Sequence, residues 1–201
     1  MKRCLALAAL TLLAGCVTVG NQSEGPAITY YVLEDAGNEA ARPAPTPSAA
    51  PLTLVVLNAR AGSFYESDQL VFSRTPGTRG QYQFARWTER PGKRLGELMR
   101  TRFERDGRWR VSEGGSYVRG DRLLDTALVE LYHDASRNPG EVHVVLRAEL
   151  VDLRTREIVG RRVFEQRAPL ARYDAAGAAQ ASGIAVARLL DDLVAWVAAV
   201  E

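Results

Sequence analysis

The sequence predicts an α+β domain in which a mainly antiparallel β-sheet has two helices packed on one face. Two segments place apolar residues at three- and four-residue spacing, which is typical of helices with one buried side. A third segment alternates apolar and polar residues between turn-forming Pro/Gly motifs, which indicates antiparallel strands with one wetter face.

The strands are expected in the following order. Residues 28–33 are rich in β-branched and aromatic side chains, and residues 52–59 form a continuous apolar run. Residues 69–74 and 81–87 flank a loop that contains one proline and two glycines, which predicts a hairpin. A short strand is expected at 109–112.

An antiparallel meander is predicted over residues 122–132, 141–153 and 157–167. In its middle strand, one face carries Val142, Val144, Leu146, Ala148 and Leu150, and the other carries His143, Arg147 and Glu149. In the strand before it, alternation predicts that the core face carries Leu123, Ala127, Val129, Leu131 and His133.

Two helices complete the prediction. Pro91 suits the first turn of a helix whose apolar stripe runs to Phe103, and Gly107 is a suitable stop. Asp174 can cap a second helix, which extends to the end of the chain. We expect this second helix to pack on the sheet. A membrane-surface helix is the alternative, but such a helix favours a basic polar face, and this one is mainly acidic there.

The N-terminus has the form of an export signal. A basic start is followed by an apolar run that ends in Leu13-Ala14-Gly15-Cys16, which resembles the bacterial lipobox. We therefore expect removal of residues 1–15 and acylation of Cys16 with diacylglycerol and an N-linked acyl chain such as palmitate. An ordinary signal peptide with a chance cysteine is the alternative. Residues 16–27 would form a tether to one domain, 28–201, that contains a Pro/Ala-rich linker at 35–51.

Composition argues against several functions. The net charge of +2 includes Lys2 and Arg3, so the processed chain is near neutral, and no nucleic-acid partner is expected. Only two histidines are present, His133 and His143, and their strand parities point to opposite faces, so no metal site is expected. No catalytic or phosphate-binding motif occurs, so the chain is not expected to be an enzyme and should hold no cofactor besides its lipid.

Several features in order resemble a known family. Tyr30-Tyr31-Val32-Leu33 follows soon after the cysteine, and the apolar strand Leu52–Leu57 comes after the linker. The segments Gln69-Leu-Val-Phe-Ser-Arg74 and Tyr82 to Pro91 precede a helix, a meander and a closing helix that contains Trp196. The set resembles the ABC-type transport auxiliary lipoproteins, the group that contains the paraquat-inducible protein C type.

The resemblance implies a function. Members accompany transporters with mammalian-cell-entry (MCE) domains, which move phospholipids or other hydrophobic molecules across the envelope. The chain would then be a periplasm-facing lipoprotein that contacts an MCE protein, and a homo-oligomer would suit ring-shaped transporters. Residue 17 is Val, not Asp, which by enterobacterial sorting rules favours the inner leaflet of the outer membrane. The alternatives are a scaffold for outer-membrane or lipopolysaccharide assembly and a lipid-carrying binding module.

The expected contact surface is the hairpin of residues 69–87. Arg74, Tyr82, Arg86 and Trp87 have the arginine and aromatic chemistry that is enriched at protein interfaces. For Trp87, packing in the core against the helix that begins at Pro91 is the competing interpretation. Arg86 could equally be a solvated strand residue.

Overall fold

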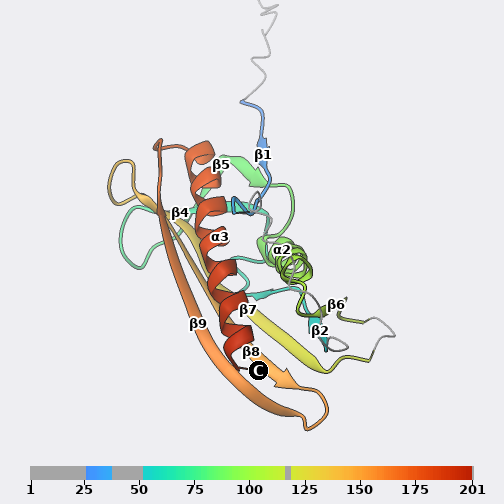
Figure 1. Ribbon diagram of the computed structural model, residues 1–201. Helices are drawn as coiled ribbons and strands as arrows, with labels where there is room; N and C mark the ends of the chain where they lie inside the picture. The colour runs from blue at the N-terminus through green and yellow to red at the C-terminus, as the bar shows by residue number, and fades with distance from the viewer. Residues whose placement is uncertain (1–25, 38–51, 116–118, 201) are drawn as a thin grey trace, which may run out of the picture.

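The computed structural model describes residues 26–37, 52–115 and 119–200. Cys16, most of the expected tether and most of the Pro/Ala-rich linker lie outside these residues. The described elements are β1 (Thr29–Tyr31), β2 (Thr53–Val56), β3 (Arg60–Ala61), β4 (Gln69–Ser73), β5 (Gly80–Trp87), α2 (Pro91–Asp106), β6 (Arg110–Glu113), β7 (Arg122–Asp134), β8 (Glu141–Asp152), β9 (Glu157–Pro169) and α3 (Ala175–Val200) (Figure 1).

The strands form one open, mixed sheet, which confirms the α+β class. The long antiparallel ladders β7–β8 and β8–β9 form the predicted meander, and β4 and β5 form the predicted hairpin. The other edge of β7 is shared by β2, β3 and β4, which pair with it in parallel one after another. The strand predicted at 52–59 is shorter than expected, because β2 ends at Val56, and β3 begins at Arg60, just beyond the predicted range.

One part of the predicted alternation in β7 is wrong. In its first half, Leu124, Thr126 and Leu128 are buried, rather than Leu123, Ala127 and Val129. The register against β8 shifts between Leu128 and Glu130, so Val129 is the extra residue of a β-bulge. The bulge reverses the parity, and Leu131 and His133 therefore face the core as expected.

Both helices cover the same face of the sheet (Figure 1). Helix α3 packs on β8 and β9, and α2 packs beside it on β2, β3 and β6. Their buried side chains, among them Met99, Phe103, Leu189 and Leu193, share one core with Leu146 and the other inward residues of the sheet. This confirms that α3 is a core helix. Among the described residues, no helix is both long enough and apolar enough to cross a bilayer.

The helix ends follow from local sequence. Pro91 occupies the first turn of α2, and Gly107 ends it in the left-handed conformation with φ 73°, donating its N–H to the carbonyl of Phe103. The Asp174 carboxylate accepts a 2.7 Å hydrogen bond from the backbone N–H of Gly177 at the start of α3.

The segment after β1 is attached to both helices. The side chain of Asp35 is only 3% exposed and forms a two-pronged ion pair with Arg102 of α2, which also binds Asp191 of α3 at 2.6 Å. The backbone N–H of Gly37 donates to the same aspartate at 3.1 Å. The folded part therefore continues past residue 35, where the linker was predicted to begin.

Candidate functional site

The four residues expected at the contact surface lie at two ends of the β4–β5 hairpin. Arg74 and Tyr82 gather around Phe72: the Arg74 guanidinium lies 4.9 Å from the Phe72 ring centroid, and the Tyr82 ring packs edge-on at 5.2 Å. Arg86 and Trp87 lie at the other end of β5, beside β1. The hairpin therefore does not bring the four side chains into one cluster.

Trp87 and Arg86 differ in exposure. Trp87 is 4% exposed and belongs to the core cluster, which supports the packing interpretation over direct partner contact. Arg86 is half-buried, and its guanidinium donates 2.9 Å hydrogen bonds to the backbone carbonyls of Tyr82 and Ala85. Those bonds hold the Arg86 side chain along its own strand and leave it partly exposed to solvent.

Tyr82 is tied to a buried histidine. Its hydroxyl lies 2.7 Å from Nδ1 of His133, whose Nε2 lies 3.0 Å from the carbonyl oxygen of Pro139. A carbonyl can only accept, so Nε2 carries the hydrogen, and Nδ1 accepts from the tyrosine. Burial lowers the pKa of His133 and raises the pKa of Tyr82 to about 12, so both stay neutral at pH 7. With His133 1% exposed and both ring nitrogens bonded, this pair supports the hairpin rather than reaching a substrate.

His143 lies on the opposite face of the sheet, as predicted. Its Nδ1 is 3.1 Å from Glu130, and its Nε2 is 2.8 Å from Glu165. The two carboxylates sit at opposite ring nitrogens, so they cannot converge on one ion with this imidazole. In the part of the chain that the structure describes, no three metal-ligating side chains form a group that could hold a metal.

A network of charges extends from His143 across this outer face. Arg79 donates to Glu130 at 2.8 Å and to the Tyr65 hydroxyl at 3.0 Å, and its guanidinium lies 3.8 Å from the Tyr132 ring centroid. These contacts fasten the loop between β4 and β5 to β7. On the same face, Glu149 of β8 forms a cross-strand ion pair with Arg161 of β9 at 2.9 Å.

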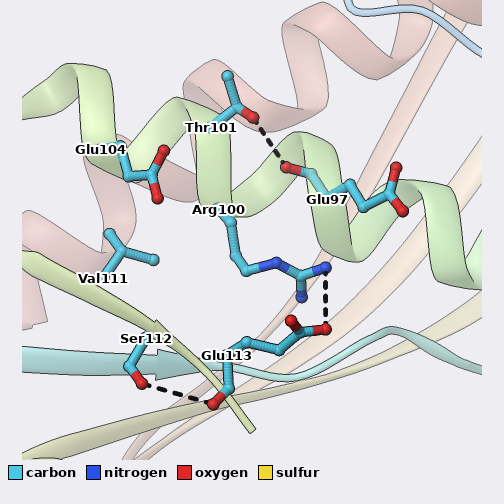
Figure 2. A pocket seen from close by; sticks show the side chains of 7 residues that line it. All are labelled: Glu97, Arg100, Thr101, Glu104, Val111, Ser112 and Glu113. Carbon is cyan, nitrogen blue, oxygen red and sulfur yellow. Dashed lines mark hydrogen bonds and ion pairs between the residues drawn. The ribbon is translucent and has the colours of Figure 1, made fainter. Parts of the chain in front are cut away.

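A polar pocket of about 450 Å³ lies between α2 and β6. Figure 2 shows Arg100 reaching from the helix towards Glu113 of β6, and the two side chains lie 3.6 Å apart. The other lining residues are Glu97, Thr101, Glu104, Val111 and Ser112. Three carboxylates and one guanidinium do not suit an acyl chain, because burying lipid requires apolar walls.

An exposed apolar patch that was not predicted from the sequence lies beside β1, and we call it the β1 patch: Ile28, Tyr30, Val32 and Phe84. Tyr30 is 60% exposed, and the other three are 40–47% exposed. Tyr31 and Leu33 turn inward, so the Tyr-Tyr-x-Leu motif divides between core and surface. Tyr30 pairs in register with Arg86, which places one predicted contact residue next to the patch. The alternation of side chains between the two faces of a strand at residues 28–33 was the sequence signal that could have predicted this patch.

Comparison with known proteins places these features in context. No match was found among curated proteins. The fold matches the crystal structure of protein XCC0632 from Xanthomonas campestris with a TM-score of 0.72 and 22% identity, covering 86% of this chain and 96% of that one. It also matches the hypothetical protein CT253 from Chlamydia trachomatis with a TM-score of 0.54 and 11% identity, covering 74% and 96%. Both similarities concern the fold alone.

The family model for the ABC-type transport auxiliary lipoprotein component matches residues 31–194. The matched region begins within the Tyr-Tyr-x-Leu motif and includes the hairpin, α2, the meander and most of α3. The chain therefore belongs to the family of ABC-type transport auxiliary lipoprotein components.

Proposed function

We propose that this chain is the membrane-tethered auxiliary subunit of an MCE-type ABC transport system that moves phospholipids or other hydrophobic molecules across the envelope. The observation that carries the proposal is the family match over residues 31–194. The matched family consists of auxiliary lipoprotein components of ABC-type transport. The MCE partner, the cargo class and a position on the inner leaflet of the outer membrane are parts of the proposal.

The anchor in this proposal is lipid on Cys16. Only nine residues, 17–25, separate Cys16 from Pro26, the first described residue. Even fully extended, they reach about 35 Å. The domain therefore stays close to the membrane, with β1 as the first described element after the tether. Two or more acyl chains hold a protein stably, whereas one gives only marginal binding.

The docking surface in this proposal combines the β1 patch with Arg86. Exposed tyrosine and phenylalanine beside an arginine match the composition of protein interfaces, and a contiguous apolar patch on a soluble domain commonly marks such a site. Tyr82 and the buried Trp87 contribute by fixing the hairpin. Arg74 lies at the far end of the hairpin and is expected to contribute less.

The alternative functions are a lipid-carrying binding module and a scaffold for outer-membrane or lipopolysaccharide assembly. A carrier needs an apolar cavity, and the pocket between α2 and β6 is polar. A scaffold would bind envelope-assembly proteins instead of a transporter.

Site-specific photo-crosslinking in cells tests the proposal. A photoreactive amino acid replaces Phe84 in the full chain, and a matched control carries it at Thr155, an exposed residue in the β8–β9 turn. We expect an MCE-domain protein among the products from position 84 and not from position 155. Products that contain only assembly proteins would favour the scaffold, and crosslinks to lipid alone would favour the carrier.

The anchor is tested separately by mass spectrometry of the chain isolated from envelopes. We expect an acylated N-terminal Cys16, and we expect Cys16→Ser to release the chain from the membrane fraction. An unmodified Cys16 in an envelope-bound chain would contradict the proposed attachment.

A further inference from the structure

The long strand β9 is an edge of the described sheet. Over Glu157–Pro169 it pairs with β8 and with no other described strand. Val163, at the middle of β9, is 60% exposed on the outer face of the sheet. An exposed edge of this length is a template for pairing with another strand unless it is protected.

The free backbone groups of β9 belong to its odd-numbered residues. The backbone N–H of Leu170 donates to Gly140 at 3.1 Å, so even-numbered residues point their N–H and C=O groups towards β8. The carbonyl of Arg167 instead accepts a 3.0 Å hydrogen bond from the Arg188 side chain of α3. Because these groups alternate along a strand, Arg161, Val163 and Glu165 turn theirs to the open edge.

The side chains of these three residues are self-complementary. They share the outer face, with a cation and an anion at equal spacing on either side of Val163. A second copy running antiparallel, with its two-fold axis at Val163, places each Arg161 opposite Glu165 of the second copy and pairs the two valines. This is the arrangement that stabilises cross-strand neighbours.

The present partners of these charges do not prevent this pairing. Arg161 binds Glu149 with its side chain 63% exposed, and Glu165 binds His143 and Arg167 with its side chain 52% exposed. Exposed ion pairs contribute little stability, so the side chains can re-pair or be shared.

Helix α3 packs against β9 on the other face of the sheet. Its residues Arg188 and Asp192 both reach β9, and Asp192 accepts a 2.6 Å hydrogen bond from Gln166. One turn further along the same side, Ala195 is exposed. Its neighbour Trp196 packs on Phe164, which places this small residue level with Val163. The α3 position nearest the centre of the proposed pairing is therefore a small side chain.

We propose that two copies of this chain associate through antiparallel pairing of β9 about Val163, which joins their sheets into one. A second copy is favoured over a foreign strand because the Arg161–Val163–Glu165 order complements itself. This inference is independent of the transport role, since it depends only on the edge of the sheet.

Sedimentation velocity of the detergent-solubilised full chain over a concentration series tests this. We expect a dimer, and we expect Arg161→Glu and Glu165→Arg each to weaken dimerisation by about tenfold or more, because each places like charges opposite one another twice. The double variant Arg161→Glu/Glu165→Arg reverses both charges and should restore wild-type association. Glu149→Gln is the matched control: it removes the intrachain partner of Arg161 and should leave the dimer unchanged.

Hydrogen exchange provides the second measurement and also reports folding. Protection of the Val163 and Glu165 amides should rise with protein concentration in the wild type and fall in the single variants, while amides in β8 stay protected in all of them. A wild type that remains monomeric would overturn the proposal. So would a double variant that fails to recover, or an oligomer that the single variants leave intact.

Discussion

Replacing Arg102 by methionine should be among the most damaging single changes to the fold outside the apolar core. Methionine preserves much of the side-chain volume but removes the guanidinium that binds Asp35. That carboxylate is 3% exposed, and its other described hydrogen bond comes from the backbone of Gly37. An uncompensated buried charge left by breaking such a pair costs about 3–5 kcal/mol.

The free energy of unfolding can be measured by urea denaturation, followed by tryptophan fluorescence. The expected loss corresponds to a decrease in melting temperature of about 6–20 °C for a domain of this size. The double variant Asp35→Ala/Arg102→Met should recover much of the loss, because no charge remains buried. A single variant that loses less than about 1 kcal/mol, or a double variant less stable than the single one, would refute the assigned role of this pair.

Three further predictions concern the hairpin and its supports. Because burial lowers the pKa of His133, the unfolded chain alone takes up its proton below about pH 6.5, so stability should be full above that pH and fall as the pH drops towards the lowered folded value. Urea midpoints between pH 7.5 and 5 measure this pH dependence of stability, and His133→Gln should flatten it. If the stability of the variant depended on pH as steeply as that of the wild type, other titrating groups would be its cause. Trp87→Ala should cost about 3–5 kcal/mol through a core cavity; a loss within the range of surface changes would return Trp87 to the list of direct contacts. Phe84→Ser should leave the melting temperature within about 2 °C but weaken partner recovery; unchanged recovery would remove the β1 patch from the docking surface.

The elements that could be predicted from sequence are those with local signals. Pro91, Gly107 and Asp174 define helix ends through backbone chemistry that acts within one turn, and the structure confirms each role. The meander was predictable for the same reason, since its strands follow one another and alternate in polarity.

Long-range pairing was not predictable in the same way. The parallel contacts of β2, β3 and β4 with one edge of β7 join residues distant in the chain, and no local pattern specifies them. The bulge at Val129 is a second case, because a single inserted residue changes which side chains are buried without changing the apolar composition. Thr126 is consequently buried, and its hydroxyl has no hydrogen-bond partner among the described residues.

The proposed docking surface keeps Arg86 from the residues expected on sequence grounds and adds others that only the fold reveals. The arginine and aromatic composition directed attention to β5, but burial separates Trp87 from Arg86, and only the β1–β5 register places Tyr30 beside Arg86. Parallel pairing of the first strand with the fifth is again a long-range feature. The β1 patch therefore emerges from the fold and not from the motif.

Affinity purification of the full chain from detergent-solubilised envelopes tests the central claim most directly, with the Tyr30→Ser/Phe84→Ser variant processed in parallel. We expect an MCE-domain protein with its permease and ATPase in the wild-type eluate, recovered reciprocally when the MCE protein is the bait, and strongly reduced in the variant. A folded, membrane-attached wild-type chain that reproducibly recovers no MCE or permease component would contradict the proposed role.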